Sequence, residues 1–262
     1  MAQQFTWDHT VEFVNDLKQA EQAFAEQGLT ASYGGKHVGH GTENSLAYFN
    51  DNYLEFLTLY SRSEALAETL TRGQIFHEAG ELLPEFEGFY RPALHVHGIE
   101  AAAERLRSKG VELGEIVPGN RTTANGEEIR WQLLWLQGDD HGLRYPFVID
   151  WDADEATQLE RYEQSGLLHR HAIGEVNTRR AIFEVPDPAA VSAHWADLFD
   201  LDRTTGVDDD GRKYFDLAVG GGRDWRFVTG DRNGITELQY TAPAGKSFDI
   251  TIGQARFRSV EA

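Results

Sequence analysis

The stretch Phe5-Thr-Trp-Asp-His-Thr-Val-Glu-Phe13 is the part of the sequence from which the fold can be worked out. Apolar and polar residues alternate along it, and His9 takes an apolar position between Trp7 and Val11. Residues two apart on a strand share a face, so the pattern predicts a strand in which Phe5, Trp7, His9, Val11 and Phe13 lie together. A buried imidazole needs a polar partner, so His9 either lines a pocket or belongs to a structural pair.

A carboxylate interrupts a second apolar strand face. In Tyr53-Leu-Glu-Phe-Leu-Thr-Leu-Tyr60, Glu55 shares its face with Tyr53, Leu57 and Leu59. Burial of an ionised carboxylate is strongly unfavourable unless the group is paired or bound to a metal. Glu55 therefore indicates a pocket lined together with His9, a structural His–Glu pair, or a strand face open to solvent.

The composition excludes several classes of partner. The 262 residues carry a formal net charge of -19, which a phosphate backbone or an anionic membrane surface would repel. The absence of cysteine excludes disulfides, thiolate metal sites and thiol nucleophiles. No apolar run is as long as a membrane span, and the opening Met-Ala-Gln-Gln-Phe5 has no signal-peptide features. We therefore expect a cytoplasmic protein that binds neither nucleic acid nor membranes.

The chain repeats one supersecondary unit three times: a strand, a helix and then two or three strands. The first copy has a strand over 6–14, a helix over 15–28 and strands over 46–49 and 53–60. The second has a strand over 92–97, a helix over 99–110 and strands over 128–137 and 143–151. The third has a strand over 181–185, a helix opened by Pro186-Asp-Pro188, and strands over 213–219, 225–229, 235–240, 247–252 and 255–260.

Such a unit has an apolar sheet face that it cannot bury by itself. Pairing of curved sheets from two units buries that face and encloses a cleft for a ligand. The sequence therefore predicts an α+β protein of three βαβββ modules that form curved mixed sheets around a cleft. We place modules one and two in residues 1–151 and module three in 177–262, with 152–176 as a connector that holds a short helix over 155–162.

Two sets of residues carry a resemblance to a known superfamily. The first is Asp8-His9 with Gly34-Gly-Lys-His-Val-Gly-His-Gly-Thr-Glu-Asn-Ser-Leu46 and Asp51-Asn-Tyr-Leu-Glu55. The second is Arg130-Trp131 with Pro146-Phe-Val-Ile-Asp-Trp151. On these residues the chain resembles the glyoxalase-like branch of the vicinal oxygen chelate superfamily over nearly its whole length, least in the third module. Members of that superfamily build sites around a divalent metal from paired βαβββ modules, and some only sequester drugs.

The resemblance implies a metal site. His9 matches the superfamily's ligand on the first strand and Glu55 its ligand on the last strand of that module, a donor pair that suits Fe(II), Mn(II), Ni(II) or Zn(II). Arg91 in module two and Arg180 in module three match His9, and Pro146 or Phe147 in module two matches Glu55; none of these residues can bind a metal. Glu237 matches Glu55 in position, so the expected ligand set of a bound metal is His9, Glu55 and Glu237.

Four further residues are expected to contact the substrate. His37 and Asn44 lie in a glycine-rich segment that lets the backbone come close to a ligand, and Arg130 and Trp131 belong to the second set above. Hydrogen bonds that stabilise the loop are the alternative role for His37 and Asn44, and a plain core position is the alternative for Trp131.

The resemblance implies a lyase, isomerase or dioxygenase in which a divalent metal holds two neighbouring oxygens of a small carbonyl, enol or aromatic diol. His9 and Glu55 are the expected catalytic residues, with Glu55 as ligand or general base. The alternative is a metal-free protein of the same fold that binds or sequesters a small molecule. An unpaired third module would favour a homodimer.

Two further groups of histidines stand out. His95 and His97 alternate on one strand, a spacing that can chelate a metal, but the expected role is an exposed polar strand face. His169-Arg-His171 lies in the connector, where a surface or boundary position is expected, although a histidine there could close over a pocket.

Overall fold

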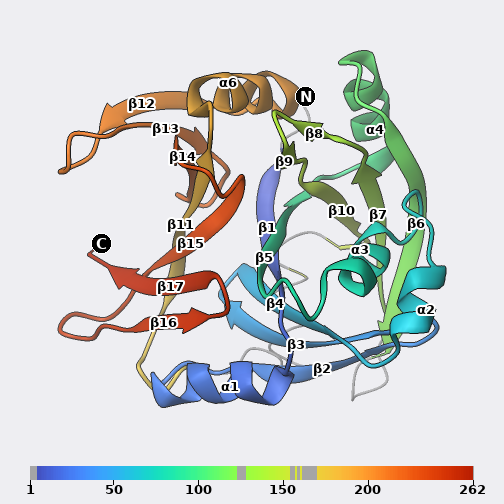
Figure 1. Ribbon diagram of the computed structural model, residues 1–262, viewed down its shortest axis with the longest axis horizontal. Helices are drawn as coiled ribbons and strands as arrows, with labels where there is room; N and C mark the ends of the chain where they lie inside the picture. Colours follow the sequence, from blue (N-terminus) through green and yellow to red (C-terminus); the bar gives the residue numbers. More distant parts are fainter. Residues whose placement is uncertain (1–4, 123–127, 154–156, 158–159, 161–169, 262) are drawn as a thin grey trace.

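The computed structural model describes residues 5–122, 128–153, 157, 160 and 170–261, which form two mixed sheets, one on each side of Figure 1. The elements of the first sheet and its helices are β1 (Thr6–Phe13), α1 (Leu17–Glu26), β2 (Ser32–His37), β3 (Thr42–Phe49), β4 (Asn52–Leu59), α2 (Arg62–Ala67), α3 (Gln74–Leu82), β5 (Gly88–His95), α4 (Ile99–Ser108), β6 (Leu113–Thr122), β7 (Glu128–Leu136) and β10 (Phe147–Trp151). A small hairpin of β8 (Asp139–Asp140) and β9 (Leu143–Arg144) precedes β10.

The second sheet follows along the chain. Its elements are β11 (Asn177–Val185), α6 (Pro188–Phe199), β12 (Arg203–Val207), β13 (Lys213–Ala218), β14 (Asp224–Thr229), β15 (Gly234–Thr241), β16 (Asp249–Ile252) and β17 (Ala255–Val260). In the part of the chain that the structure describes, no helix is long and apolar enough to cross a membrane.

The strand pairing confirms repeated βαβββ modules. The first sheet has the order β2-β3-β4-β1-β5-β10-β7-β6, in which β1 runs parallel to β4 and antiparallel to β5, while β5 runs parallel to β10. The second sheet has the order β12-β13-β14-β11-β15-β17-β16 and repeats these relations with β11, β14, β15 and β17. β15, β16 and β17 thus repeat the second module in reduced form, without a helix between β15 and β16. The strands predicted over 247–252 and 255–260 therefore belong to a fourth, shortened module and are not additions to the third.

A β-bulge in β1 corrects the predicted alternation. The register with β5 shifts between Trp7 and His9, which inserts one residue, Asp8, into the strand. Phe5 and Trp7 therefore belong to the core between the sheets, and Val11 and Phe13 belong to a separate cluster on the other face. The prediction that all five alternate residues share one face is wrong, because a bulge reverses the face of every residue before it.

One hydrophobic core joins the two sheets. It contains α1, α4 and α6, whose buried stripes agree with the periodicity of the sequence. Aromatic pairs cross it directly: the rings of Trp7 and Trp225 have centroids 6.2 Å apart, and those of Phe24 and Phe257 are 5.1 Å apart. The apolar faces that single modules leave uncovered are buried against each other in this way.

The connector is described only in part, since 154–156, 158–159 and 161–169 lie outside the described residues, as do most of the predicted helix over 155–162 and His169. His171 is buried, its Nδ1 accepts a hydrogen bond of 3.0 Å from the backbone N–H of Thr30, and its ring lies beside Phe49. Of the two predicted positions for His171, the surface one is therefore excluded, and the contact with Thr30 is a boundary contact between the connector and the first module.

Glu12 on β1 is a buried carboxyl in this core. It is fully shielded from solvent, and among the described residues neither of its oxygens has a hydrogen-bond partner. Burial, together with the nearby charge of Glu87, raises the pKa of Glu12 well above its ordinary value of 4.5. The carboxyl is therefore protonated in the folded chain at pH values at which the unfolded chain ionises it.

We predict that Glu12 makes the fold less stable as the pH rises. The stabilisation from its raised pKa is fully present below the ordinary glutamate pKa. Between that value and the raised pKa of the folded chain, the free energy of unfolding falls by about 1.4 kcal/mol per pH unit. Urea unfolding at a series of pH values from pH 5 upward should show the unfolding free energy falling more steeply with pH in the wild type than in Glu12→Gln. Equal slopes in both proteins would contradict the prediction.

Candidate functional site

The candidate site lies on the face of the first sheet against which α3 packs, here called the α3 face. One buried cluster fills most of it and consists of Val11, Phe13, Leu57, Ile75, Ala79, Leu83, Ala93, Trp135, Phe147 and Ile149. His9 and Glu55 lie on the same face, two residues before Val11 and Leu57 on their strands. The face thus carries an apolar cluster under α3, and His9 and Glu55 lie next to that cluster.

His9 is fixed by its neighbours on β1 and β4. It is 3% exposed, its ring stacks on Tyr53 at 4.3 Å, and its Nδ1–H donates to Oδ1 of Asp8 at 2.5 Å. Oδ2 of Asp8 accepts a hydrogen bond of 2.9 Å from Nε1 of Trp151. Burial raises the pKa of Asp8, but the hydrogen bond and charge of His9 outweigh it and hold the pKa of this carboxyl below its usual range. With Nδ1 engaged by Asp8, Nε2 is the ring nitrogen of His9 that remains for another partner.

Glu55 faces His9 across a short gap. Its Oε2 lies 3.8 Å from Nε2 of His9, too far for a hydrogen bond, and its Oε1 accepts one of 2.7 Å from Nδ2 of Asn44. Nε2 of His37 lies 3.9 Å from Oε1 of Glu55, and Nδ1 of His37 is hydrogen-bonded to Thr42. Exposure of the side chain increases from 3% in His9 to 12% in Glu55 and 27% in His37, so solvent reaches the pair from the side of His37.

The second module does not repeat these two residues. β1 and β5 are counterparts, so the predicted match of His9 with Arg91 makes Ala93 the counterpart of Val11. Val11 pairs with Glu55 and Ala93 pairs with Phe147, so Phe147 is the counterpart of Glu55. Arg91 is 1% exposed and directs its guanidinium at Glu78 on α3, 3.4 Å away. A buried ion pair and a phenyl ring therefore stand where the predicted fold would place two more metal ligands.

Glu237 is not the counterpart of Glu55. The bulge between Thr178 and Arg180 repeats the bulge between Trp7 and His9, so Arg180 corresponds to His9. From this register Ile182 corresponds to Val11, and Ile182 pairs with Arg226 on β14 and with Glu237 on β15.

It follows that Arg226 stands at the position of Glu55 and Glu237 at that of Arg91. Glu237 pairs with Arg258 at 2.7 Å and with Arg256 at 3.5 Å within the second sheet. Among the described residues, the metal-capable groups of three do not include His9, Glu55 and Glu237. The predicted positional match is therefore wrong, because Glu237 lies on β15, which corresponds to β5, whereas Glu55 lies on β4, which corresponds to β14.

The predicted substrate contacts lie in different places. His37 and Asn44 stand beside Glu55, as described above, and Trp131 is half-buried on the α3 face, 5.6 Å from Trp151. Arg130 is exposed, points away from Trp131 by the alternation of β7, and pairs with Glu128 at 2.6 Å. The structure thus brings three of the four to the α3 face.

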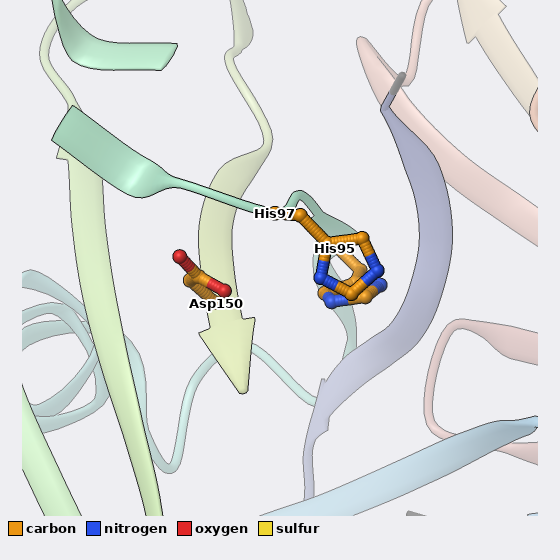
Figure 2. Close-up of side chains that lie close together, drawn as sticks. All are labelled: His95, His97 and Asp150. Atoms are coloured by element: carbon orange, nitrogen blue, oxygen red, sulfur yellow. The ribbon is translucent and has the colours of Figure 1, made fainter. Parts of the chain in front are cut away.

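Two other features lie outside the His9–Glu55 pair, although the charge of His95 in the second of them also lowers the pKa of Asp8. A cleft with a volume of about 160 Å³, lined by Tyr90, Arg144 and Arg232 among others, opens between the two sheets. At the ends of β5 and β10, His95, His97 and Asp150 come together (Figure 2). His95 is buried rather than exposed, which corrects the prediction of a polar surface there, and His97 is exposed as expected.

Residues 7–199 match the family model described as glyoxalase-like domain. The chain belongs to the glyoxalase-like domain family. This assignment confirms the predicted resemblance to the vicinal oxygen chelate superfamily, and it covers the first sheet and the start of the second.

Solved structures agree with this glyoxalase-like fold. A hypothetical protein from Staphylococcus aureus has a TM-score of 0.81 at 22% identity, with 99% of this chain and 100% of that chain covered. A mutant of 4-hydroxymandelate synthase from Streptomyces coelicolor has a TM-score of 0.54 at 11% identity, over 91% of this chain and 71% of that one. A xylose isomerase-like TIM barrel/4-hydroxyphenylpyruvate dioxygenase fusion protein has a TM-score of 0.53 at 13% identity, over 90% of this chain and 36% of that one. No curated protein matches the sequence significantly.

Sequence reasoning missed two residues of this glyoxalase-like chain that orient others. Asp8 anchors the ring of His9, and only the bulge places both side chains together. Asp150 lies beside His95 and His97 although it is 55 residues from His95 in sequence. Only the pairing of β5 with β10 brings these residues together, so a correct prediction of that pairing would have identified Asp150.

We predict that Glu78→Ala destabilises the fold by about 3–5 kcal/mol, because it leaves the buried guanidinium of Arg91 without its partner. Replacing both by apolar residues, in Arg91→Met with Glu78→Leu, should cost clearly less. Glu81→Ala, on the exposed side of the same helix, is the control and should change the unfolding free energy by less than about 0.5 kcal/mol. Urea unfolding measures all three, and a Glu78→Ala effect no larger than that of Glu81→Ala would contradict the prediction.

Proposed function

We propose that the α3 face binds a small oxygen-bearing molecule and that His9 and Glu55 move a proton on it, as in a lyase or isomerase. The observation that carries the proposal is the distance of 3.8 Å between Nε2 of His9 and Oε2 of Glu55. A ligand atom placed beside this gap can reach both groups at hydrogen-bond distance. Two acid–base groups directed at one point are the arrangement that proton abstraction next to a carbonyl requires.

Each group of the pair has one side anchored and one side directed at the other. Asp8 accepts the proton of Nδ1, so Nε2 of His9 is the basic atom. Asn44 holds Oε1 of Glu55, so Oε2 is the oxygen available for a proton. Anchoring of this kind lowers the reorganisation needed when the proton moves.

The surrounding side chains support binding of a compact ligand. Half-buried Phe76, Leu133, Trp131 and Trp151 supply apolar surface on the α3 face. His37, which is the most exposed of the polar group, is placed to contact the ligand as it reaches Glu55. Polar groups that fix orientation within an apolar lining are typical of small-molecule sites.

The residues present do not supply the four-ligand metal set that the superfamily implies. His9 and Glu55 provide one half, and Arg91 and Phe147 occupy the other half without a donor for a cation. Arg91 also brings a positive charge that is held by Glu78. The proposed proton transfer therefore uses no metal at this pair.

The presence of Arg91 and Phe147 at two expected ligand positions favours a second candidate, a protein that binds a small molecule on the α3 face without catalysing a reaction. Loss of ligand positions in one module leaves the binding surface intact, since the apolar residues of the cluster remain. The two candidates differ in whether His9 and Glu55 exchange protons with the bound molecule.

We predict that the protein catalyses deuterium exchange at the carbon next to the carbonyl in at least one member of a panel of small 2-oxoacids and α-hydroxyketones. Proton NMR in deuterium oxide measures the exchange rate. His9→Ala and Glu55→Gln should each lower the rate by roughly a hundredfold or more, because each removes a general acid–base group. Glu104→Gln, an exposed carboxylate on α4, is the matched control and should leave it unchanged.

Thermal melting in the presence of the same panel separates the candidates. A ligand that raises the melting temperature without exchange supports the binding protein. Exchange that chelator abolishes and a divalent metal restores would support metal assistance and contradict the metal-free mechanism. Neither exchange nor a shift in melting temperature with any member would overturn both candidates for this ligand class.

A further inference from the structure

Three side chains that can bind a metal converge where β5 and β10 end and α4 begins (Figure 2). His95 is the last residue of β5, His97 follows in the turn that leads to α4, and Asp150 is in β10. One ligand atom of each lies within 4.8 Å of the other two. Within the described ranges, this is the group of three His and acidic residues that meets such a distance.

The backbone holds the three residues in place. β5 and β10 run parallel with His95 opposite Ile149, and the N–H of Val96 donates to the carbonyl of Ile149 at 3.0 Å. Parallel strands bring their carboxyl ends to one edge of a sheet, so residues far apart in sequence meet there. The site is therefore built on hydrogen-bonded strands and not on a loop alone.

Asp150 is oriented by the start of α4. Its Oδ2 accepts hydrogen bonds from the backbone N–H groups of Gly98 at 2.8 Å and Ile99 at 2.9 Å. Figure 2 shows one carboxylate oxygen of Asp150 directed toward the two imidazole rings. Hydrogen bonds that fix one oxygen of a carboxylate and leave the other for a cation are a common support for metal ligands.

We propose that His95, His97 and Asp150 bind a divalent transition-metal ion of the Zn(II) type. Two imidazole nitrogens and one carboxylate oxygen suit zinc and its neighbours and not the all-oxygen sites of Mg²⁺ or Ca²⁺. Three protein ligands leave one position of a tetrahedral ion for water or a small ligand.

Closure of the site requires only a small adjustment. Ligands at about 2.0–2.1 Å from zinc lie roughly 3.3 Å apart in a tetrahedron, so ligand atoms that lie within 4.8 Å of one another need to approach by at most about 1.5 Å. His97 is exposed and lies outside regular structure, so a change of its side-chain rotamer supplies most of this movement. His95 is buried and Asp150 is held by α4, so these two form the fixed part of the site.

This site goes beyond the proposed function and shares none of the residues of the His9–Glu55 pair. A bound ion would tie the ends of two parallel strands to the start of a helix and would stabilise the folded chain. Its presence or absence leaves the proton-transfer proposal unchanged, because that proposal uses no metal.

The test is calorimetric titration of Zn²⁺ and absorption spectroscopy with Co²⁺, using full-length protein purified without an affinity metal and freed of ions by chelator. We expect one ion per chain, a tetrahedral Co²⁺ spectrum and a higher melting temperature with Zn²⁺. His97→Ala and Asp150→Asn should each weaken binding at least tenfold; the amide oxygen of Asn keeps the hydrogen bonds to α4, and His97 is exposed, so both variants should fold.

Two matched controls locate the ion. His141→Ala removes an exposed histidine of the β8–β9 turn, and His9→Ala removes the histidine of the proposed reaction; both should bind Zn²⁺ as the wild type does. The proposal is overturned if the wild type binds no Zn²⁺ or Co²⁺, if His97→Ala and Asp150→Asn bind them unchanged, or if His9→Ala alone abolishes binding. Loss of deuterium exchange with intact Zn²⁺ binding, or the reverse, shows which of the two proposals has failed.

Discussion

The antiparallel pairing of β1 with β5, interrupted by the bulge at Asp8, is the constraint on which the rest of the structure depends. The pairing joins two modules into one continuous sheet, and the bulge decides which side chains of β1 face the core and which face α3. Trp7 lies in the core between the sheets, while His9 lies on the opposite face with its ring held by Asp8. A strand without the extra residue would place one of these two side chains on the wrong face.

The periodicity of the sequence was sufficient for most of the fold. Strands and helices with strong apolar patterns, such as β1, α4 and α6, lie where the pattern predicts. β2 escaped prediction because Gly34 and Gly35 interrupt its pattern, and α3 because half of its buried face is polar. Of the candidate site, the sequence indicated His9 and Glu55 and, beside them on the α3 face, His37, Asn44 and Trp131. Asp8, Asp150 and the place of Glu237 depend on a bulge and on strand register, which are set by contacts between distant segments.

The second sheet shows that this architecture does not require the chemistry of the first. Its bulge between Thr178 and Arg180 repeats that of β1, but Arg180 and Arg226 stand where the first sheet has His9 and Glu55. These arginines pair with Asp216 and Asp224, so the face is a network of ion pairs. The bulge is thus present in both sheets, whereas the side chains at these positions differ between them.

Helix α3 has a consequence for selectivity. It comes from the segment inserted between β4 and β5, and it fills one end of the face that His9 and Glu55 share. On the proposal that this face binds a small molecule, α3 limits the length of ligand that fits, because the part of the sheet that the helix covers is closed to the ligand. On the same proposal, a shorter segment between β4 and β5 would leave room for a longer ligand beside the same His–Glu pair.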